Sequence, residues 1–482
     1  MDSKRFSVVV CGGGSGAHVA AAFLGQPRHR IDVRILSFTS ADKLRAAGVE
    51  TRGITAVVTC QESPPITAIT SGMVTRVSSD PADVVPGADL ILVALPSQFH
   101  RQVLQAVAPH VKDGASIGNL QASSTFGLMV REAMAAANAS HRRLSAVWGL
   151  MCLPYACRVT TPGTVNLMNT KATANVCVLP ASQRPVVVDI LQSFLNLQGC
   201  ALHMRRSFFS LAMSSHVIAH TSISYGRWHA WDGEETFLEA PKFYHGVDDF
   251  TAELLESGDS EVKAVCKAAN KQSKSILQAN HPSIREIQVA MYSDLLGDTS
   301  SIKGALTTNS LYSWVTHPMK PAPDGTDRVV PDFEHRFVAE DVPALLVPLC
   351  GWGRILGVPT PRSDWVLEGL QRLMGKEWLV DGELTGKDMA DTACHAPQTF
   401  GVTSIQDDVE LAFEFEANPA LTSTTALPSV NSPKVAEPVL ELIRSLSLAA
   451  SMSFASDADS GILSRAGSLS RSESLATAVP VA

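Results

Sequence analysis

A glycine-rich loop near the N-terminus has the spacing that binds the pyrophosphate of a dinucleotide. It follows an apolar run over 7–11 and precedes a helical pattern over 19–24, which is the strand, turn and helix context that the motif requires. Gly12 permits the tight turn, Gly14 lets the backbone approach the phosphates, and Ala17 lets the helix pack closely on the strand. The start of the helix adds free N–H groups and the positive end of a dipole. The residues expected to hold the cofactor here are Gly12, Gly14, Ser15, Gly16 and Ala17.

The sequence leaves the choice between NADH and NADPH open. An acidic residue normally ends the second strand of such a fold, where its carboxylate holds the adenosine ribose. The strand expected over 31–38 has no acid at its end. We expect Ser37 to contact the cofactor, and Ser37, Thr39, Lys43 and Arg45 could together surround a 2′-phosphate. The same residues would also suit an ordinary solvated turn.

Two histidines in the second half of the chain could do acid–base or metal chemistry. His216 and His220 lie four residues apart on an apolar segment expected to be helical, so their imidazoles share one face. Such a pair can bind a metal, but no third ligand follows at helical spacing, and we expect no metal site. Spacing alone leaves two interpretations of each histidine, a buried core residue and a catalytic acid or base.

Several motifs together resemble the opine dehydrogenases, with the nearest likeness to the octopine dehydrogenase type. In family order over 5–405, the longer matching runs are 12–18, 153–158, 226–233, 375–382 and 384–388. Shorter matches lie at 239–241, 243–244, 307–309, 317–318, 336 and 340–341. The resemblance implies an oxidoreductase that condenses an amino acid with an α-keto acid such as pyruvate. It also implies that hydride from NADH or NADPH reduces the resulting imine, and that the partners are small-molecule substrates.

By that resemblance, five residues are assigned to the substrate site. His220 matches the family's catalytic histidine, and Asp341 matches the carboxylate that fixes the tautomer of this histidine. Arg336 matches the arginine that binds the keto-acid carboxylate, a task that suits a bidentate guanidinium. Gln121 and Trp228 match positions expected to contact substrate. The alternative for Arg336 and Asp341 is an ordinary surface ion pair.

One departure from the octopine-type pattern concerns the amine substrate. Those enzymes carry an acid two residues before the Leu-Pro run, where it receives the guanidinium of arginine. Here Met151 stands at that position, followed by Cys152. Because burying a guanidinium without a carboxylate is costly, we expect Met151 and Cys152 to contact a smaller or apolar amino acid, such as alanine, glycine or methionine. The alternative is that an acid from elsewhere, such as Asp232 or Asp248, binds arginine.

The order of elements predicts two domains and a tail. Residues 1–204 alternate short β-rich and helical runs, which predicts an α/β, Rossmann-type, doubly wound parallel sheet. Its strand over 89–95 ends at Pro96, which we expect at the nicotinamide half of the cofactor. Residues 205–408 carry long apolar-periodic stretches and predict a mainly α-helical substrate domain. Residues 409–482, rich in Ser, Ala, Thr and Pro, predict a disordered low-complexity tail.

The composition is that of a globular protein. The chain has 482 residues, and 39 Lys and Arg against 47 Asp and Glu give a net charge of −8. This balance, without a basic run, disfavours nucleic acid and anionic membranes as partners. The longest apolar stretch, near 343–357, is interrupted and too short to span a bilayer. Nine scattered cysteines and the absence of a signal-type N-terminus predict a cytoplasmic protein, which we expect to be a monomer or a dimer.

The sequence leaves two other functions open. One is a carbonyl reductase similar to ketopantoate reductases or hydroxyacid dehydrogenases, which would reduce a keto acid without an amine. The other is a nicotinamide-binding scaffold without catalytic activity. Dependence of NAD(P)H oxidation on a keto acid, an amine or both would distinguish the three.

Overall fold

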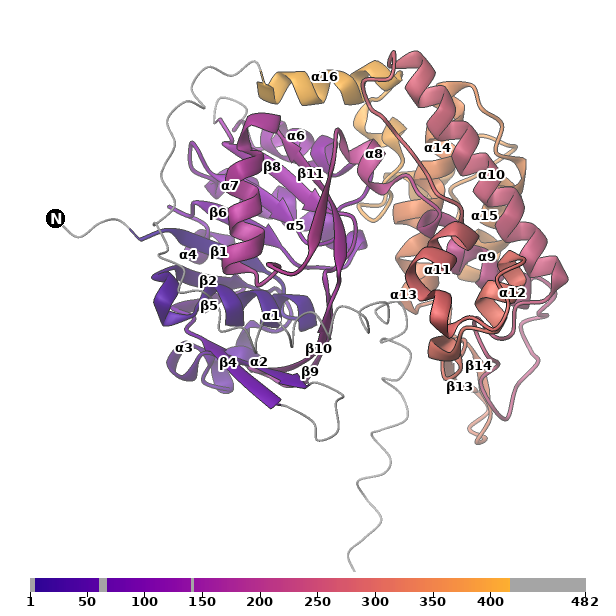
Figure 1. Cartoon of the computed structure of the whole chain (residues 1–482), viewed down its shortest axis with the longest axis horizontal. Coiled ribbons are helices and arrows are strands. Elements are labelled where there is room, and N and C mark those ends of the chain that lie inside the picture. The colour runs from indigo at the N-terminus through magenta and orange to yellow at the C-terminus, as the bar shows by residue number, and fades with distance from the viewer. Residues whose placement is uncertain (1–4, 60–66, 140–142, 417–482) are drawn as a thin grey trace, which may run out of the picture.

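A computed structural model describes residues 5–59, 67–139 and 143–416, which form two domains side by side (Figure 1). The first domain is built on an eight-stranded sheet with the strand order β12-β11-β8-β7-β6-β1-β2-β5. In chain order these strands are β1 (Ser7–Cys11), β2 (Asp32–Leu36), β5 (Arg76–Ser78), β6 (Leu90–Val93), β7 (Ser116–Asn119), β8 (Ala146–Leu150), β11 (Thr173–Leu179) and β12 (Ala201–Arg205). Neighbouring strands run parallel, except that β11 is antiparallel to β8.

Helices cover both faces of this sheet. Because successive residues of a strand point to opposite faces, Val8 and Val10 pack on one side with α1 (Ser15–Leu24) and α7 (Arg184–Asp189). Val9 packs on the other side with α5 (His100–Val107) and α6 (Phe126–Ala136). Shorter helices connect the outer strands, namely α2 (Ala41–Ala46), α3 (Val49–Arg52) and α4 (Pro81–Val84). The doubly wound Rossmann-type arrangement expected from the sequence is confirmed.

A second, four-stranded sheet flanks the first domain and was not expected from the sequence. Its order is β4-β3-β10-β9. The strands are β3 (Ile54–Thr59), β4 (Thr67–Gly72), β9 (Tyr155–Thr161) and β10 (Thr164–Thr170). β3 and β10 pair in parallel, although β5 to β8 lie between them in the chain. The sheet supports α1, since the Val159 N–H donates to Ser15 Oγ at 3.0 Å.

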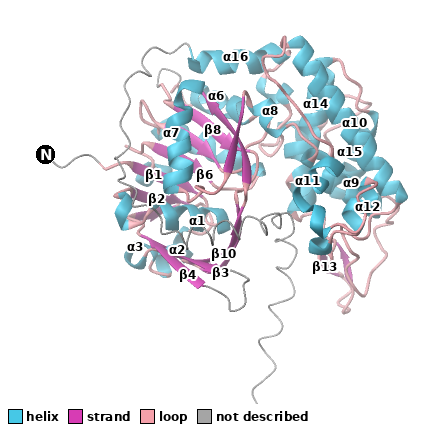
Figure 2. Ribbon diagram, in the orientation of Figure 1, coloured by secondary structure: helices cyan, strands magenta, loops and turns pink. Residues whose placement is uncertain are grey.

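The second domain is mainly helical, as expected (Figure 2). Its helices are α8 (Phe208–Ala212), α9 (His216–Trp228), α10 (Asp249–Gln272), α11 (Ile284–Tyr292), α12 (Ile302–Thr307), α13 (Arg336–Ala339), α14 (Val347–Leu356) and α15 (Pro361–Met374). Two short antiparallel strands, β13 (Met319–Pro321) and β14 (Val329–Pro331), lie at one end. On α9, Ile218 and Ile223 are buried in the helical core, whereas His216 and His220 remain partly exposed. The core therefore fixes the helix that carries both histidines.

The last described helix, α16 (Ile405–Glu416), returns to the first domain and lies beside α6 (Figure 1). Its Val409 and Leu411 are buried. The expected start of the tail at 409 is therefore corrected, because apolar burial continues the folded structure through these positions. The disordered tail expected beyond falls, from 417 on, outside the described residues. No helix in the described part of the chain is long and apolar enough to cross a membrane.

Candidate active site

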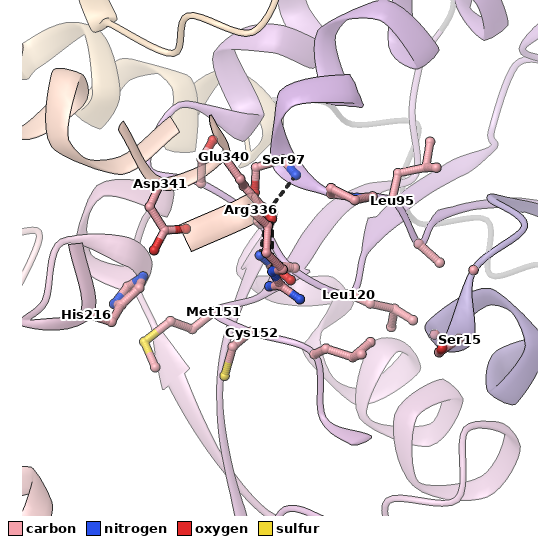
Figure 3. A pocket seen from close by; sticks show the side chains of 18 of the residues that line it. Ser15, Leu95, Ser97, Leu120, Met151, Cys152, His216, Arg336, Glu340 and Asp341 are labelled. Carbon is pink, nitrogen blue, oxygen red and sulfur yellow. Dashed lines mark hydrogen bonds and ion pairs between the residues drawn. The ribbon is translucent and has the colours of Figure 1, made fainter. Parts of the chain in front are cut away.

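A cavity of about 310 Å³ lies where the two domains meet. The first domain lines it with residues that follow β1, β6, β7 and β8, which are four adjacent strands of the sheet. The second domain lines it with residues of α9 and of the segment that begins at α13. Figure 3 shows Arg336, Glu340 and Asp341 on one side and Ser15 at the start of α1 on the other. Since open α/β sheets bind ligands at the carboxyl ends of their strands, this cavity is the candidate active site.

The glycine loop has the geometry that a dinucleotide phosphate requires. Gly12 has φ +142°, and a Cβ there would lie 2.4 Å from the carbonyl oxygen of Ala94. A Cβ on Gly14 would meet nothing within 4 Å, so the loop backbone faces open space. No side chain caps the first N–H groups of α1. Gly14, Ser15 and Gly16 line the cavity, and their backbone fits a nicotinamide dinucleotide.

Of the other residues expected at the cofactor, one lines the cavity and three do not. Pro96 lines the cavity beside Leu95, at the end of β6. Gly12, Ala17 and Ser37 are not among the residues that line the cavity. Ser37 lies next to the loop, since a Cβ on Gly13 would be 2.8 Å from its Oγ. Ser37 is buried, and its Oγ accepts a hydrogen bond from the Ser40 N–H at 3.2 Å.

His220 lies between two polar partners at the cavity wall. Its Nδ1 is 2.7 Å from Oδ2 of Asp341, and its Nε2 is 3.1 Å from the hydroxyl oxygen of Tyr244. Both the histidine and the aspartate are nearly buried, and the imidazole stacks on the ring of Phe337 at 4.2 Å. The carboxylate accepts the Nδ1 proton, which fixes the tautomer and leaves Nε2 for acid–base chemistry. Asp341 follows α13, so residues 121 positions apart in the chain are brought together.

Arg336 and Glu340 form a second charged pair in the same cavity. Nε of Arg336 lies 3.5 Å from Oε2 of Glu340. The arginine side chain is 42% exposed and therefore accessible to a ligand, whereas the glutamate side chain is 1% exposed. Oε1 of Glu340 accepts hydrogen bonds of 2.8 Å from the Ser97 N–H and from Nε2 of Gln121. Burial raises the pKa of Glu340.

Glu340 and Tyr244 are residues for which sequence reasoning proposed no role. The signal for Glu340 was its position, four residues after Arg336 and directly before Asp341. Its two partners in the first domain, Ser97 and Gln121, could not be identified from spacing. Tyr244 belongs to a short run that matches the family, but its contact with His220 could not be predicted because it depends on how the helices pack.

Met151 and Cys152 lie at the end of β8 and also line the cavity. A cation that the sequence reasoning did not consider, Lys171, lies beside them, and its Nζ donates to Sγ of Cys152 at 2.9 Å. Asp232 and Asp248, the acids considered as substitutes at Met151, do not line this cavity. Asp232 accepts hydrogen bonds within its own loop, and Asp248 caps α10.

The structure separates the two histidines of α9 and excludes Trp228 from the site. Nδ1 of His216 is 2.6 Å from Oγ of Ser214, and burial is the main cause that lowers the pKa of His216 to about 4. Trp228 lies eight residues beyond His220, about 12 Å along the helix axis, and donates to Nδ1 of His317. Trp228 is therefore not brought to the cavity. Among the described residues, no group of three His, Cys, Asp or Glu is arranged to hold a metal ion.

A second cavity, of about 200 Å³, adjoins the first. Residues that line both are Met151, Cys152, Lys171, His216 and His220. The second cavity extends from these residues between β11 and β12 of the sheet and the helices α9 and α11. It therefore offers space for part of a substrate whose reacting end lies beside His220.

Known proteins resemble this chain across both domains. A family model described as NAD/NADP octopine/nopaline dehydrogenase, alpha-helical domain, matches residues 190–374. The chain is 31% identical to octopine dehydrogenase of Mizuhopecten yessoensis, over 83% of this chain and 97% of the relative. It is 30% identical to opine dehydrogenase of Haliotis discus hannai, over 84% and 98%. A solved structure of octopine dehydrogenase with NADH and L-arginine superposes with a TM-score of 0.72 at 27% identity, covering 83% of this chain and 97% of that one.

Proposed function

The chain belongs to the opine dehydrogenase family, and on that premise we propose how its own residues carry out the reaction. It is an NAD(P)-dependent oxidoreductase that acts on a CH–NH bond and condenses an amino acid with an α-keto acid. One observation carries the assignment of roles. His220, held between Asp341 and Tyr244, faces the same cavity as Arg336 and the glycine loop.

The first domain holds the cofactor. Gly14, Ser15 and Gly16 would bind the phosphates through backbone N–H groups, and Pro96 would border the nicotinamide half. When bound, the nicotinamide supplies the hydride that reduces the imine carbon. NADH and NADPH differ by a 2′-phosphate on the adenosine ribose, and both fit the proposed binding of the other phosphates. Arg45, one candidate for a 2′-phosphate, already donates to Asp42 and to the carbonyl of Val77.

His220 is the proton donor in this proposal. When the amine adds to the keto acid, the carbonyl oxygen must gain protons and leave as water before the imine is reduced. Nε2 of His220 delivers a proton to that oxygen, and Asp341 stabilises the imidazolium from the Nδ1 side. Tyr244, 3.1 Å from Nε2, orients the ring toward the cavity.

Arg336 binds the carboxylate of the keto acid. Its guanidinium is accessible, and its planar fork matches two carboxylate oxygens. Glu340 orients the guanidinium from behind, while Gln121, which donates to Glu340, lies within reach of the same substrate. The keto acid would thus be held between Arg336 and His220.

We also propose that arginine is not the preferred amine. The position two residues before the Leu-Pro run is Met151, and neither Asp232 nor Asp248 lines the cavity in its place. A guanidinium would therefore lose its hydration without meeting a carboxylate there. A smaller amino acid, such as alanine or glycine, avoids this cost.

A spectrophotometric assay tests the proposal. Purified protein is mixed with pyruvate, a panel of amino acids and either NADH or NADPH, and the loss of nicotinamide absorbance is followed. Oxidation that requires keto acid and amine together is expected. Oxidation with the keto acid alone would favour a carbonyl reductase, and cofactor binding without turnover of any pair would favour a scaffold.

We propose a cytoplasmic location and no nucleic-acid or membrane partner. The eight cysteines among the described residues are free thiols, which suits a reducing compartment. The net charge of −8 would disfavour anionic polymers and surfaces. Sedimentation of the full chain would distinguish a monomer from a dimer, and cell fractionation would test the location.

A further inference from the structure

The second cavity is positioned to receive the side chain of the amine substrate. It shares His220, Met151 and Lys171 with the first cavity, so the two spaces meet at the proposed proton donor. An amine bound next to the keto acid would extend its side chain into this space. The chemistry of the cavity wall would then select the amine.

The charged groups of this wall are all cationic. Lys171 and Arg205 line the second cavity, and no Asp or Glu is among the described residues that line it. His216 and His220 are the other basic residues of the wall, and the depressed pKa of His216 keeps its imidazole neutral near pH 7. The remaining wall is neutral, with apolar side chains such as those of Ile284 and Met291.

Neighbouring groups hold both cations in place. Arg205 ends β12, and its Nε donates to Oδ1 of Asn175 at 2.9 Å. Nζ of Lys171 donates to Sγ of Cys152 at 2.9 Å, beside the Met151 position. Burial lowers the pKa of Arg205, which means that its charge is partly removed from water without an acid in the cavity wall to compensate. An anionic group on a ligand would supply that compensation.

We propose that the second cavity selects an amino acid with an acidic side chain, whose carboxylate is bound by Lys171 and Arg205. The proposal rests on the proposed reaction, and it replaces the expected small or apolar amine by an acidic one. A glutamate or aspartate side chain places a carboxylate two or one methylene groups beyond the α-carbon, within a cavity of about 200 Å³. The guanidinium of arginine would instead meet two like charges, which acts against this substrate.

Steady-state kinetics with matched amines tests this selectivity. With pyruvate and NADH, or NADPH where that is the cofactor used, kcat/KM is compared for glutamate, glutamine, alanine and arginine. Glutamine has nearly the shape of glutamate without its charge, so their ratio isolates the contribution of the carboxylate. We expect glutamate to exceed glutamine by about 10- to 100-fold, the range of a hydrogen bond to a charged group.

The outcomes separate this inference from the proposed function. Turnover of alanine, glutamine or arginine at or above the rate for glutamate would overturn the inference and leave the reaction class intact. A complete lack of amine-dependent oxidation across the panel would contradict both.

Four single variants and one double variant test which residues cause the selectivity. Arg205→Gln and Lys171→Met should each lower the ratio of glutamate to glutamine, whereas Arg205→Lys should retain most of it. Arg206→Gln is the matched control, because Arg206 is the exposed neighbour and its Nε donates to Gln278 outside the cavity. Thermal unfolding of each variant checks that it is folded. An unchanged ratio in a folded Lys171→Met, Arg205→Gln double variant would refute the assignment of the two cations.

Discussion

Glu340 of the helical domain accepts a hydrogen bond of 2.8 Å from the backbone N–H of Ser97 in the Rossmann-type domain. The two residues are 243 positions apart, and the contact is buried. Because the same carboxylate also lies 3.5 Å from Nε of Arg336, one side chain joins the two domains and orients the guanidinium that we propose as the keto-acid binding group. The site is therefore complete only when the two domains are held together.

Glu340→Ala should weaken the contact between the two domains and the binding of the keto acid. The Ser97 N–H and the Gln121 amide would lose a buried charged acceptor, which should lower the free energy of unfolding by about 2–4 kcal/mol. The KM for the keto acid should rise as well, because Arg336 loses its orienting partner. Chemical denaturation and steady-state kinetics measure the two effects. Glu334→Ala, at an exposed glutamate paired with Lys320, is the control and should cost less than about 1 kcal/mol.

Two glycines of the same loop should respond differently to substitution by alanine. Gly14→Ala adds a methyl group in open space, so stability should change little while the dissociation constant for NADH rises at least tenfold, about 1.4 kcal/mol. Gly12→Ala forces a Cβ onto the Ala94 carbonyl at φ +142° and should destabilise the fold by about 1–3 kcal/mol. Cofactor titration and thermal unfolding give both quantities. Undiminished NADH binding by Gly14→Ala would contradict the phosphate assignment.

Arg336→Lys should act mainly on the keto acid. Lysine keeps the charge but loses the planar fork, so the KM for pyruvate should rise by about 10- to 100-fold while the KM for the amine changes little. Initial rates at varied pyruvate and fixed amine measure this. Equal changes in both KM values would mean that Arg336 does not distinguish the two substrates.

Stability should fall as the pH rises from about 4 to 7 through Asp408 on α16. Burial raises the pKa of Asp408 to about 7, above its unfolded value of 3.8, so the folded state binds the extra proton in this window. Because the folded state holds one more proton than the unfolded state, the free energy of unfolding decreases by up to about 1.4 kcal/mol for each unit by which the pH rises. Relative to Asp408→Asn, the wild type should lose stability across this range, as measured by denaturation at several pH values. A difference in stability between the wild type and Asp408→Asn that does not change with pH would show that the pKa of Asp408 is not raised.

Much of the Rossmann-type domain could be predicted because its signals are local. β1 is a continuous apolar run that ends in the glycine loop, and all five of its residues are buried. The second sheet was not predicted, because its strands are rich in Thr, because β9 and β10 are partly exposed, and because β3 pairs with the distant β10. Non-local pairing of this kind leaves no periodic signal in either segment.

Contacts in the candidate active site were also not predictable where they join distant segments of the chain. His216 and His220 have the same spacing and the same apolar surroundings in the sequence. In the structure, His220 meets Asp341 and His216 meets Ser214. Only the family resemblance distinguished His220 from His216 in the sequence. The contact between α9 and the segment after α13 arises from tertiary packing, so the spacing of the histidines could not predict it.

The role of His220 as proton donor is tested most directly by the rate of amine-dependent oxidation of NADH or NADPH by His220→Ala, measured beside the wild type and beside His203→Ala at an exposed histidine of β12. We expect kcat to fall by about 10²- to 10⁴-fold in His220→Ala, as for loss of a catalytic acid, while cofactor binding by this variant and the kcat of His203→Ala stay close to the wild-type values. A rate within a few-fold of the wild type would show that another group protonates the departing oxygen and that the central assignment is wrong.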